Sequence, residues 1–318
     1  MISHKKILVT GGSGFIGSAI VKDLVKQRHK VRVLDNQSRG TIRKLDDVKG
    51  NFEMVIGDIR DPRIVEKSCE GIDLVIHLAY INGTEFFYSK PELVLEVGVK
   101  GMVNILDGCI KKNVKELMVA SSSEVYQTPS LIPTPENVPL TVPDPLNPRY
   151  SYGGGKIISE LMAINYGRKF FKRVIIFRPH NVYGPDMGEE HVIPQLLLRI
   201  NKLSDFKKSI NLEIQGLGKE TRAFIYIDDF VRGFETIFKK GKNMQIYNIG
   251  TMDEISVKQL IEIMGKILSK RINIVPGKLS EGSTLRRCPD ITKINKLGFK
   301  PKISIEEGLQ KTIQWYNR

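Results

Sequence analysis

The residues best suited to proton transfer are Tyr152 and Lys156, which stand four positions apart. On an α-helix this spacing places both side chains on one face, one turn from each other. An ammonium close to a phenol stabilises the phenolate and lowers the pKa of the phenol. Tyr152 could then take the proton of a hydroxyl group while hydride leaves the same carbon. The pair therefore predicts oxidation and reduction of an alcohol.

A serine cluster supplies a second candidate group. Ser121, Ser122 and Ser123 follow the apolar run 117–120, and Glu124 comes next. Such a cluster often only begins a loop. A hydroxyl at the end of a strand could nevertheless face the tyrosine and bond the reacting oxygen.

Residues 11–17 carry the spacing of a dinucleotide-binding turn, with glycines at 11, 12, 14 and 17. Glycines let the backbone approach a pyrophosphate, and the following helix offers free N–H donors and the positive end of its dipole. Asp35 ends the next apolar run, about 20 residues on, and could accept both ribose hydroxyls. Because its carboxylate repels a 2′-phosphate, we predict NAD rather than NADP, a preference that Arg39 would weaken if it folded toward the ribose. Asp58 would lie near the adenine, or else cap a turn.

Gly153, Gly154 and Gly155 separate the tyrosine from the lysine. Three glycines in a helix cost about 3 kcal/mol relative to alanines. Something must therefore come close to this backbone. We expect a cofactor or sugar there, and close helix packing is the alternative.

The elements that must position these residues follow from the pattern of apolar runs. Short runs rich in β-branched residues alternate with longer helical patterns, which predicts an α/β doubly wound parallel sheet of the Rossmann type with helices on both faces. The predicted strands are 6–10, 31–34, 52–56, 74–78, 117–120 and 174–177. Tyr152 and Lys156 open the helix predicted over 151–168, at the carboxyl edge of the sheet where ligands of such folds bind. A tyrosine four residues before a lysine is common in proteins, but its position at this edge of the sheet favours a functional role for the pair.

The second half of the chain has a different composition and a different pattern of predicted elements. The proline-rich stretch 128–149 predicts a long ordered loop or lid. After residue 179 the elements become shorter and mixed, so we expect an NAD-binding Rossmann domain over 1–179 and a smaller, mixed α/β substrate-binding domain over 180–318, with room for the chain to cross back. Two late helices are predicted to begin with capping boxes, at Ser256 with Gln259 and at Ser304 with Glu307.

Composition excludes several classes of protein. The chain has 318 residues, of which 41% are hydrophobic and 26% charged, so it is neither disordered nor a small stapled module. No stretch reaches the roughly eighteen apolar residues of a membrane helix, and the first apolar run is too short for a signal peptide. We therefore expect a cytoplasmic protein without a membrane partner. The net charge of +14 comes from scattered lysines, which favours a solvated surface over a nucleic-acid site.

Other chemistries lack the residues they need. Cys69, Cys109 and Cys288 form no CxxC pair, which argues against a disulfide framework or a zinc ribbon. The five histidines lack metal-ligand spacing, and His77 fits the core of a strand, so we expect no metal. A Walker-type phosphate loop is absent as well.

Together these motifs resemble the extended short-chain dehydrogenase/reductase family, in particular the NAD-dependent nucleotide-sugar epimerases, dehydratases and decarboxylases, among them UDP-glucose 4-epimerase. The likeness runs from Lys5 to Trp315. It rests on the segments 11–17 with Asp35, 57–61, 75–79, 121–126, Tyr152 with Lys156, 178–185, 220–229 and 286–290.

The resemblance implies a role for each matching residue. Tyr152 would be the base, Lys156 would hold the nicotinamide ribose, Ser122 would be the hydroxyl partner and Glu124 the extra carboxylate of dehydratases and decarboxylases. Cofactor contacts are implied for Gly11, Gly14, Phe15, Ile16, Gly17, Asp35, Asn36, Asp58, Ile59, Leu78, Ala79 and Lys156. Substrate contacts are implied for Ser122, Ser123, Asn181, Arg222 and Arg287. Asn181 and the two arginines would grip a diphosphate, which charge-assisted bonds can neutralise.

Four positions depart from the family pattern. Tyr80 replaces a small residue, Gly98 an asparagine and Gln127 a glycine, and Gln215 stands where relatives often carry an aromatic. These departures bear on the sugar pocket and on recognition of the nucleotide base.

The resemblance also implies a shared first step, in which the sugar is oxidised at C4 to a 4-keto intermediate. We expect a nucleotide-sugar 4-epimerase that works as a homodimer. A 4,6-dehydratase or uronate decarboxylase using Glu124 is the alternative, although Ser123 stands where dTDP-glucose 4,6-dehydratases carry an aspartic acid. A 4-dehydrogenase or ketoreductase and, more remotely, a non-catalytic NAD-sensing protein also stay open.

Overall fold

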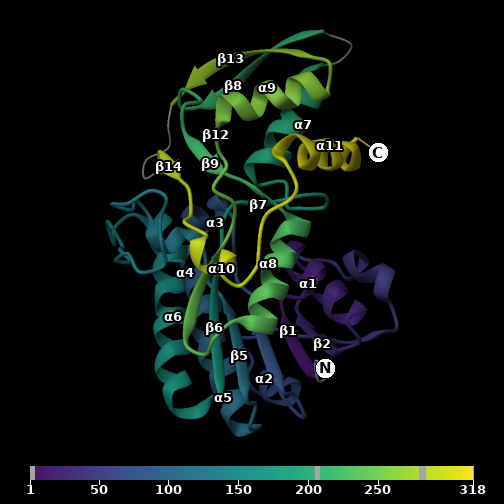
Figure 1. Ribbon diagram of the computed structural model, residues 1–318, viewed down its shortest axis with the longest axis vertical. Coiled ribbons are helices and arrows are strands. Elements are labelled where there is room, and N and C mark those ends of the chain that lie inside the picture. The colour runs from purple at the N-terminus through teal and green to yellow at the C-terminus, as the bar shows by residue number, and fades with distance from the viewer. Residues whose placement is uncertain (1–3, 205–207, 279–283, 318) are drawn as a thin grey trace.

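A seven-stranded parallel sheet forms the larger part of the protein, as the computed structural model shows (Figure 1). The structure describes residues 4–204, 208–278 and 284–317. The strand order is β11-β6-β5-β4-β1-β2-β3. These strands are β1 (Lys6–Thr10), β2 (Lys30–Asp35), β3 (Phe52–Ile56), β4 (Leu74–His77), β5 (Glu116–Ala120), β6 (Arg173–Pro179) and β11 (Gln245–Ile249). The six predicted strands are confirmed, with small differences at their ends.

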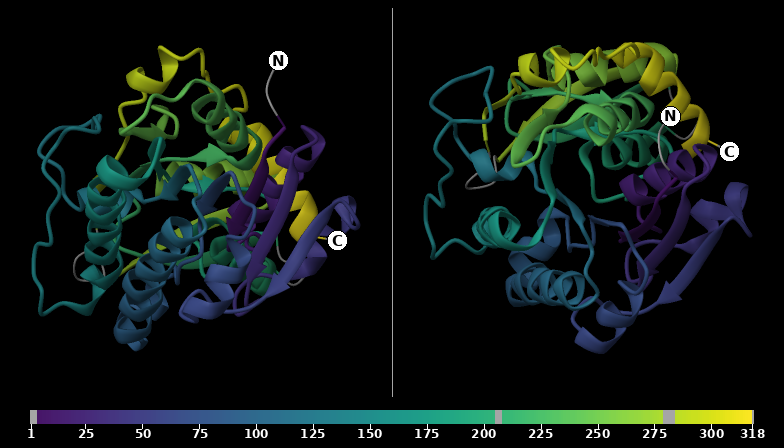
Figure 2. Two further views of the ribbon diagram at one scale, coloured as in Figure 1. Left: turned by 90° about the horizontal axis from the view of Figure 1, so that it is seen from below. Right: turned by 60° about the horizontal axis from the view of Figure 1, so that its bottom comes forward.

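Both faces of the sheet are covered by helices, which explains why the strands are almost continuously apolar. Ile7 and Val9 of β1 lie in the core shared with α1 (Phe15–Lys26) and α8 (Ile227–Lys240). Leu8, between them, lies in the opposite core. That second core is shared with the helices α2 (Pro62–Ser68), α5 (Gly101–Lys111) and α6 (Ser151–Phe170) (Figure 2). The predicted doubly wound fold is confirmed.

The strand order reverses between β1 and β4, and a crevice opens at the carboxyl ends of these strands. Thr10 and His77 are register partners at that edge, and the Thr10 hydroxyl lies 2.8 Å from Nδ1 of His77. The turns that follow approach closely, since a Cβ on Gly11 would lie 2.8 Å from the backbone of Ala79. Only glycine fits at position 11, because the backbone that follows β4 lies so close to it.

Smaller sheets and short helices build the other part of the protein, drawn at the top of Figure 1. The strand pairs are β7 (Val182–Tyr183) with β10 (Ile225–Tyr226), β8 (Ser209–Gln215) with β13 (Arg271–Gly277), and β9 (Thr221–Ala223) with β12 (Glu254–Ser256) and β14 (Arg286–Arg287). The longer helices are α7 (Val192–Ser204), α9 (Val257–Ile267) and α11 (Ile305–Tyr316). Short helices occur in both parts of the protein. They are η1 (Ile42–Val48), α3 (Thr84–Ser89), α4 (Pro91–Leu95), η2 (Glu96–Lys100), η3 (Ser123–Tyr126), η4 (Pro148–Tyr150) and α10 (Thr292–Asn295). Among them η1, α4 and η2 pack against helices that cover the large sheet.

The chain crosses between these parts. After β10 it enters α8 and then β11, which pairs with β6 at the edge of the large sheet. The second half of the sequence therefore completes the sheet that the first half begins.

The proline-rich segment is an ordered loop, as predicted. Residues 127–147 contain neither helix nor strand, apart from one bridge between Thr134 and Pro289. Thr134 donates its N–H to the carbonyl of Cys288 at 2.9 Å, and Glu136 accepts the N–H of Asn248 at 2.9 Å. These bonds tie the loop to residues more than a hundred positions away.

The two predicted capping boxes differ. Ser256 and Gln259 form the complete reciprocal pair at the start of α9. At α11 the Ser304 hydroxyl accepts the N–H of Glu307, but the Glu307 carboxylate turns to Lys311 instead, at 2.8 Å. The second prediction is therefore only half right, because an ion pair one turn further along competes for the glutamate.

None of the described helices is both long and apolar enough to cross a membrane. The described residues contain no group of three or more histidine, cysteine, aspartate or glutamate side chains placed to hold a metal ion.

A buried ion pair joins α6 to β6. Arg178 donates to both carboxylate oxygens of Glu160, at 2.8 and 2.6 Å, and the two side chains are only 1% and 3% exposed. Arg178 also donates to the Tyr126 hydroxyl at 2.6 Å. The pair fixes the helix that carries Tyr152 against the sheet.

We predict that Arg178→Leu lowers the free energy of unfolding by about 3–5 kcal/mol, because it leaves a buried carboxylate without its partner. Urea unfolding would measure the change. Removing Lys311 from its exposed pair with Glu307 is the control and should cost no more than about 0.5 kcal/mol. An equal effect of the two substitutions would contradict the prediction.

Candidate active site

A cavity of about 1030 Å³ opens along the carboxyl edge of the large sheet. It reaches from the glycine turn and Asp35 to Tyr152 and Arg287. Sites for one small ligand usually measure about 300–1,000 Å³. The cavity is therefore large enough for a dinucleotide with a second ligand beside it.

The glycine turn fits a pyrophosphate. Gly11 has a φ of +71°, and a Cβ on Gly17 would lie 2.1 Å from the carbonyl oxygen of Gly11. Gly14, at the start of α1, offers no side-chain cap. The first N–H groups of α1 are thus left for an anion in the cavity, where the helix dipole adds to the attraction.

Asp35 holds the turn and faces the cavity. Its carboxylate accepts the N–H of Ser13 at 3.0 Å and that of Gln37 at 2.7 Å. Each of its oxygens keeps a lone pair for a ribose hydroxyl. The residue is 9% exposed, and that exposure is to the cavity.

Asp58 is held by a charged neighbour. Arg60 donates to it at 2.8 Å, and the Asn36 amide donates to the same carboxylate at 2.9 Å. The hydrogen bond from Arg60 is the main reason that the pKa of Asp58 falls to about 2. Asp58 therefore stays ionised at the adenosine end of the cavity.

Arg39 does not fold toward Asp35. It forms an ion pair with Glu190, and its guanidinium lies 4.7 Å from the centre of the Phe86 ring. Burial lowers the pKa of Arg39, and the charges of Glu85 and Tyr152 act in the opposite direction. The preference of Asp35 for NAD over NADP is therefore not weakened by this residue.

A second ion pair reinforces the first. Lys44 of η1 pairs with Asp186 and also donates to the Asp186 carbonyl at 2.7 Å. The loop after β2 is thus bound twice to the loop before α7, and residues of both loops line the cavity.

Every cofactor contact implied by the sequence lies at this cavity. The lining includes Gly11, Gly14, Phe15, Ile16, Gly17, Asp35, Asn36, Asp58, Ile59, Leu78, Ala79 and Lys156. It also includes Ser122, Ser123, Glu124, Tyr152, Asn181 and Arg287. Among the implied residues, Arg222 is the exception.

Arg222 turns away from the cavity lining. Its guanidinium donates to the carbonyls of Thr221 and Thr284, each at 2.7 Å. Burial and the nearby charge of Arg287 lower its pKa to about 10. Backbone carbonyls accept the hydrogen bonds of Arg222 in this structure, and its expected grip on a ligand stays a prediction.

Tyr152 lies in the first turn of α6, enclosed by aromatic rings. Phe87 stacks on it with ring centres 4.8 Å apart, and Tyr80 meets it edge-on at 5.1 Å. Burial raises the pKa of Tyr152, a hydrogen bond with Ser122 lowers it, and the charge of Glu124 raises it. The net shift is upward.

Lys156 does not counter this shift. Its ammonium donates to the Ala120 carbonyl at 2.6 Å and lies 5.8 Å from the centre of the Tyr152 ring. Burial lowers the pKa of Lys156 to about 7, although Glu160 acts in the opposite direction. In the cofactor-free protein burial thus raises the pKa of Tyr152. The predicted lowering, which also counts on the positive charge of a bound nicotinamide, stays a prediction.

The glycines between these residues make room for protein side chains. A Cβ on Gly155 would lie 2.1 Å from the Tyr80 hydroxyl, and one on Gly153 would lie 2.5 Å from the Gln127 amide. Gly154 meets nothing closer than Val142, at 3.5 Å. Close packing within the protein thus accounts for Gly153 and Gly155, and the expected cofactor or sugar contact stays a prediction.

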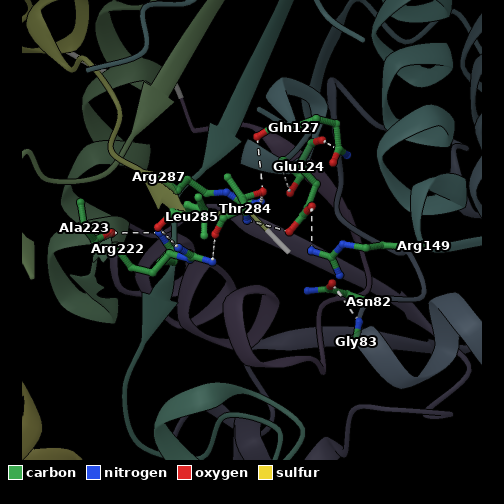
Figure 3. A network of polar contacts seen from close by, with 12 residues as sticks. Asn82, Gly83, Glu124, Gln127, Arg149, Arg222, Ala223, Thr284, Leu285 and Arg287 are labelled. Carbon is green, nitrogen blue, oxygen red and sulfur yellow. Dashed lines mark hydrogen bonds and ion pairs between the residues drawn. The ribbon is translucent and has the colours of Figure 1, made fainter. Parts of the chain in front are cut away.

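Glu124 lies at the centre of an arginine cluster (Figure 3). Arg287 donates to it at 2.6 Å, and Arg149, which comes from η4, lies 3.8 Å away. Burial would raise the pKa of Glu124, but the charges of Arg287 and Arg149 hold it below its usual value. The carboxylate is therefore ionised at neutral pH.

Asn181 and Arg287 approach the cavity from the smaller part of the protein. Asn181 has a φ of +41° and donates its amide to the Ala223 carbonyl at 3.2 Å. Arg287 also donates to the Thr284 hydroxyl at 3.0 Å. Both residues are held in place by their own partners before any ligand is considered.

Sequence reasoning missed Phe87, Arg149 and Glu190. The aromatic run 86–88 was a usable signal for Phe87, and Arg149 stands only three residues before Tyr152. Nothing local marks Glu190, whose partner Arg39 is 151 positions away.

Comparison with known proteins places these features in a family. A model of the NAD dependent epimerase/dehydratase family matches residues 7–250. A UDP-N-acetyl-alpha-D-glucosaminuronate decarboxylase of Bacillus cytotoxicus is 31% identical over 98% of both chains.

Two solved structures show the same overall fold. UDP-glucose 4-epimerase of Thermotoga maritima, solved with UDP-glucose, has a TM-score of 0.87 and 29% identity over 98% of both chains. The dTDP-glucose 4,6-dehydratase DesIV of Streptomyces venezuelae, a double mutant solved with NAD, has a TM-score of 0.86 and 28% identity over 98% of this chain and 97% of that one. Similar proteins thus catalyse three different reactions.

We predict that Lys156→Met stabilises the cofactor-free protein at neutral and acidic pH. The unfolded chain holds the lysine proton up to about pH 10.5 and the folded protein only up to about pH 7, so the wild type gains stability as the pH rises between these values. The variant lacks this dependence. Its advantage should be on the order of a few kcal/mol at pH 7 and should vanish toward pH 10.

Thermal unfolding over this pH range would measure the effect, with exposed Lys311→Met as the control. A difference that is the same at every pH would contradict the assignment to Lys156.

Proposed function

Because the chain belongs to the NAD-dependent epimerase/dehydratase family, we propose that it is a nucleotide-sugar 4-epimerase that acts through a transient 4-keto sugar. It is an enzyme whose cofactor is NAD. When bound, NAD takes up a hydride from the sugar and gives it back.

One observation carries the proposal. Tyr152, Ser122 and Lys156 meet at one end of the cavity whose other end is the glycine turn with Asp35. A proton-transfer pair and a dinucleotide cradle in one continuous space are the requirements for reversible oxidation of an alcohol.

Each of the three residues has a distinct task. The phenolate form of Tyr152 takes the proton of the sugar O4 and later returns it. The Ser122 hydroxyl, which bonds to Tyr152, is placed to hold the reacting oxygen. The Lys156 ammonium offers positive charge beside the developing phenolate, which is effective because the surroundings are buried.

Glu124 favours epimerisation over dehydration. Its pKa is lowered by Arg287 and Arg149, so it is ionised and cannot supply the proton that a leaving hydroxyl group requires. The neighbouring Ser123 is not an acid. Epimerisation needs no further acid, since the hydride returns to C4 on its other face and the proton returns to O4.

The substrate we propose is a sugar carried on a nucleoside diphosphate. Arg287 and Arg149 are two cations beside a single carboxylate, which leaves positive charge at the sugar end of the cavity. The UDP-glucose in the Thermotoga epimerase structure supports the same class of ligand. A cytoplasmic location and a homodimer complete the proposal.

Decarboxylation of a uronic acid is the second candidate function. The observation that supports it is again the environment of Glu124. An ionised glutamate with two arginines beside the base offers more charged groups than epimerisation needs. Loss of carbon dioxide from a 4-keto uronate requires only the ketone to take up the electron pair. The similar Bacillus cytotoxicus protein is a decarboxylase of such a sugar.

We expect incubation with a panel of UDP-, dTDP-, GDP- and CDP-sugars to invert one of them at C4. Proton NMR would follow the H4 signal, and a parallel assay would measure carbon dioxide. Tyr152→Phe should reduce the rate by at least about 100-fold without loss of bound NAD. Release of carbon dioxide or a stable 4-keto product, with no 4-epimer, would reject the epimerase.

Glu124→Gln separates the two candidates. In an epimerase no proton passes through Glu124, so we expect the rate to fall by less than about tenfold. In a decarboxylase or dehydratase that uses the carboxylate, the loss should exceed about 100-fold. Thermal unfolding of the variant is the control for damage to the arginine cluster.

A further inference from the structure

Tyr80 fills a slot between two helices. It follows Ala79 in the loop after β4, and its hydroxyl end enters between Gly98 of η2 and Gly155 of α6. A Cβ would lie 2.0 Å from the hydroxyl oxygen at Gly98 and 2.1 Å from it at Gly155. Two glycines from separate elements thus create the space that this one ring occupies.

The ring of Tyr80 faces the Lys156 ammonium. Nζ of Lys156 lies 3.9 Å from the ring centre, well inside the range of about 6 Å for attraction between a cation and an aromatic face. The same ring meets Tyr152 edge-on at an interplanar angle of 84°. Tyr80 therefore contacts both residues of the proposed proton-transfer pair.

We propose that Tyr80 is a positioning residue, which holds the Lys156 ammonium in its charged form and in its place through the face of its ring. The proposal rests on the proposed function only in giving Lys156 a catalytic purpose. The contact itself is a property of the protein and can be tested without substrate.

The surroundings of Lys156 explain why such a contact is needed. Burial lowers the pKa of the lysine to about 7, and a neutral amine could not stabilise a phenolate. The charged or titratable groups that face it are Glu160 on its own helix, Tyr152 and, from β4, His77. Glu160 is already committed to Arg178, and burial lowers the pKa of His77 to about 3, so that imidazole is neutral.

The ring, and not the hydroxyl, performs this task. Within the described residues the buried hydroxyl of Tyr80 has no hydrogen-bond partner. Because the hydroxyl bonds to no other described group, it contributes no hydrogen bond to Lys156, and burying it unpaired is itself unfavourable. Phenylalanine keeps the aromatic face and is therefore the matched control for leucine, which does not.

A double-mutant cycle in the cofactor-free protein tests the contact. Tyr80→Leu is made in the wild type and in Lys156→Met, and urea unfolding is measured at pH 5.5 and pH 9.5. At pH 5.5 the coupling should change the unfolding equilibrium by roughly two- to thirty-fold. At pH 9.5, where Lys156 is neutral in the folded protein, the coupling should change the unfolding equilibrium by a factor close to one. Equal coupling at both pH values would show packing alone and overturn the proposal.

The pH profile of the enzyme gives the second readout. In Tyr80→Leu the alkaline limb of kcat/KM should move about half to one and a half pH units lower, because Lys156 loses its proton earlier. Tyr80→Phe should restore both the limb and the coupling. A limb that stays in place or moves to higher pH, or a phenylalanine variant that behaves like the leucine variant, would refute the role of the ring.

Failure of the proposed function would look different. If the chain catalyses another reaction, the cycle in the cofactor-free protein still gives the pH-dependent coupling. If the cycle shows no such coupling while epimerisation is observed, only the role of Tyr80 fails.

Discussion

The site depends on keeping a positive charge where water is scarce. A buried lysine tends to lose its proton, since the protein interior cannot replace the hydration of an ammonium. Lys156 receives one carbonyl, from Ala120, and one aromatic face, from Tyr80. Its nearest carboxylate is held by an arginine. The carbonyl and the aromatic face therefore oppose the effect of burial and favour the charged form of the lysine.

The architecture that creates this environment could be predicted because its signals are local. Each strand is a short apolar run, and the glycine turn with Asp35 lies within thirty residues of sequence. The parallel sheet then brings the ends of β1, β4 and β5 to one edge, so the part of the cavity lining next to these strands follows from strand order. For this reason the implied cofactor residues all lie where the turn and the sheet edge place them.

The parts that could not be predicted depend on contacts between distant segments. Tyr80, Gly98 and Gly155 each look like an isolated oddity in the sequence, and only the structure shows that they are one packing solution. Arg222 matches a family motif, yet its guanidinium donates to the backbone carbonyl of Thr284. The upward shift of the Tyr152 pKa in the cofactor-free protein could not be predicted either, because spacing reveals a neighbouring charge but not the loss of solvent.

The pairing of β11 with β6 also limits how this protein can be divided. A fragment ending near Pro179 would leave the outer edge of β6 without a neighbour, and an open strand edge invites association with other chains. It would also lack α8, whose Phe230 and Phe234 pack on that side of the sheet. Residues 1–179 are therefore not a separable module, since the second half of the chain completes their sheet and covers it.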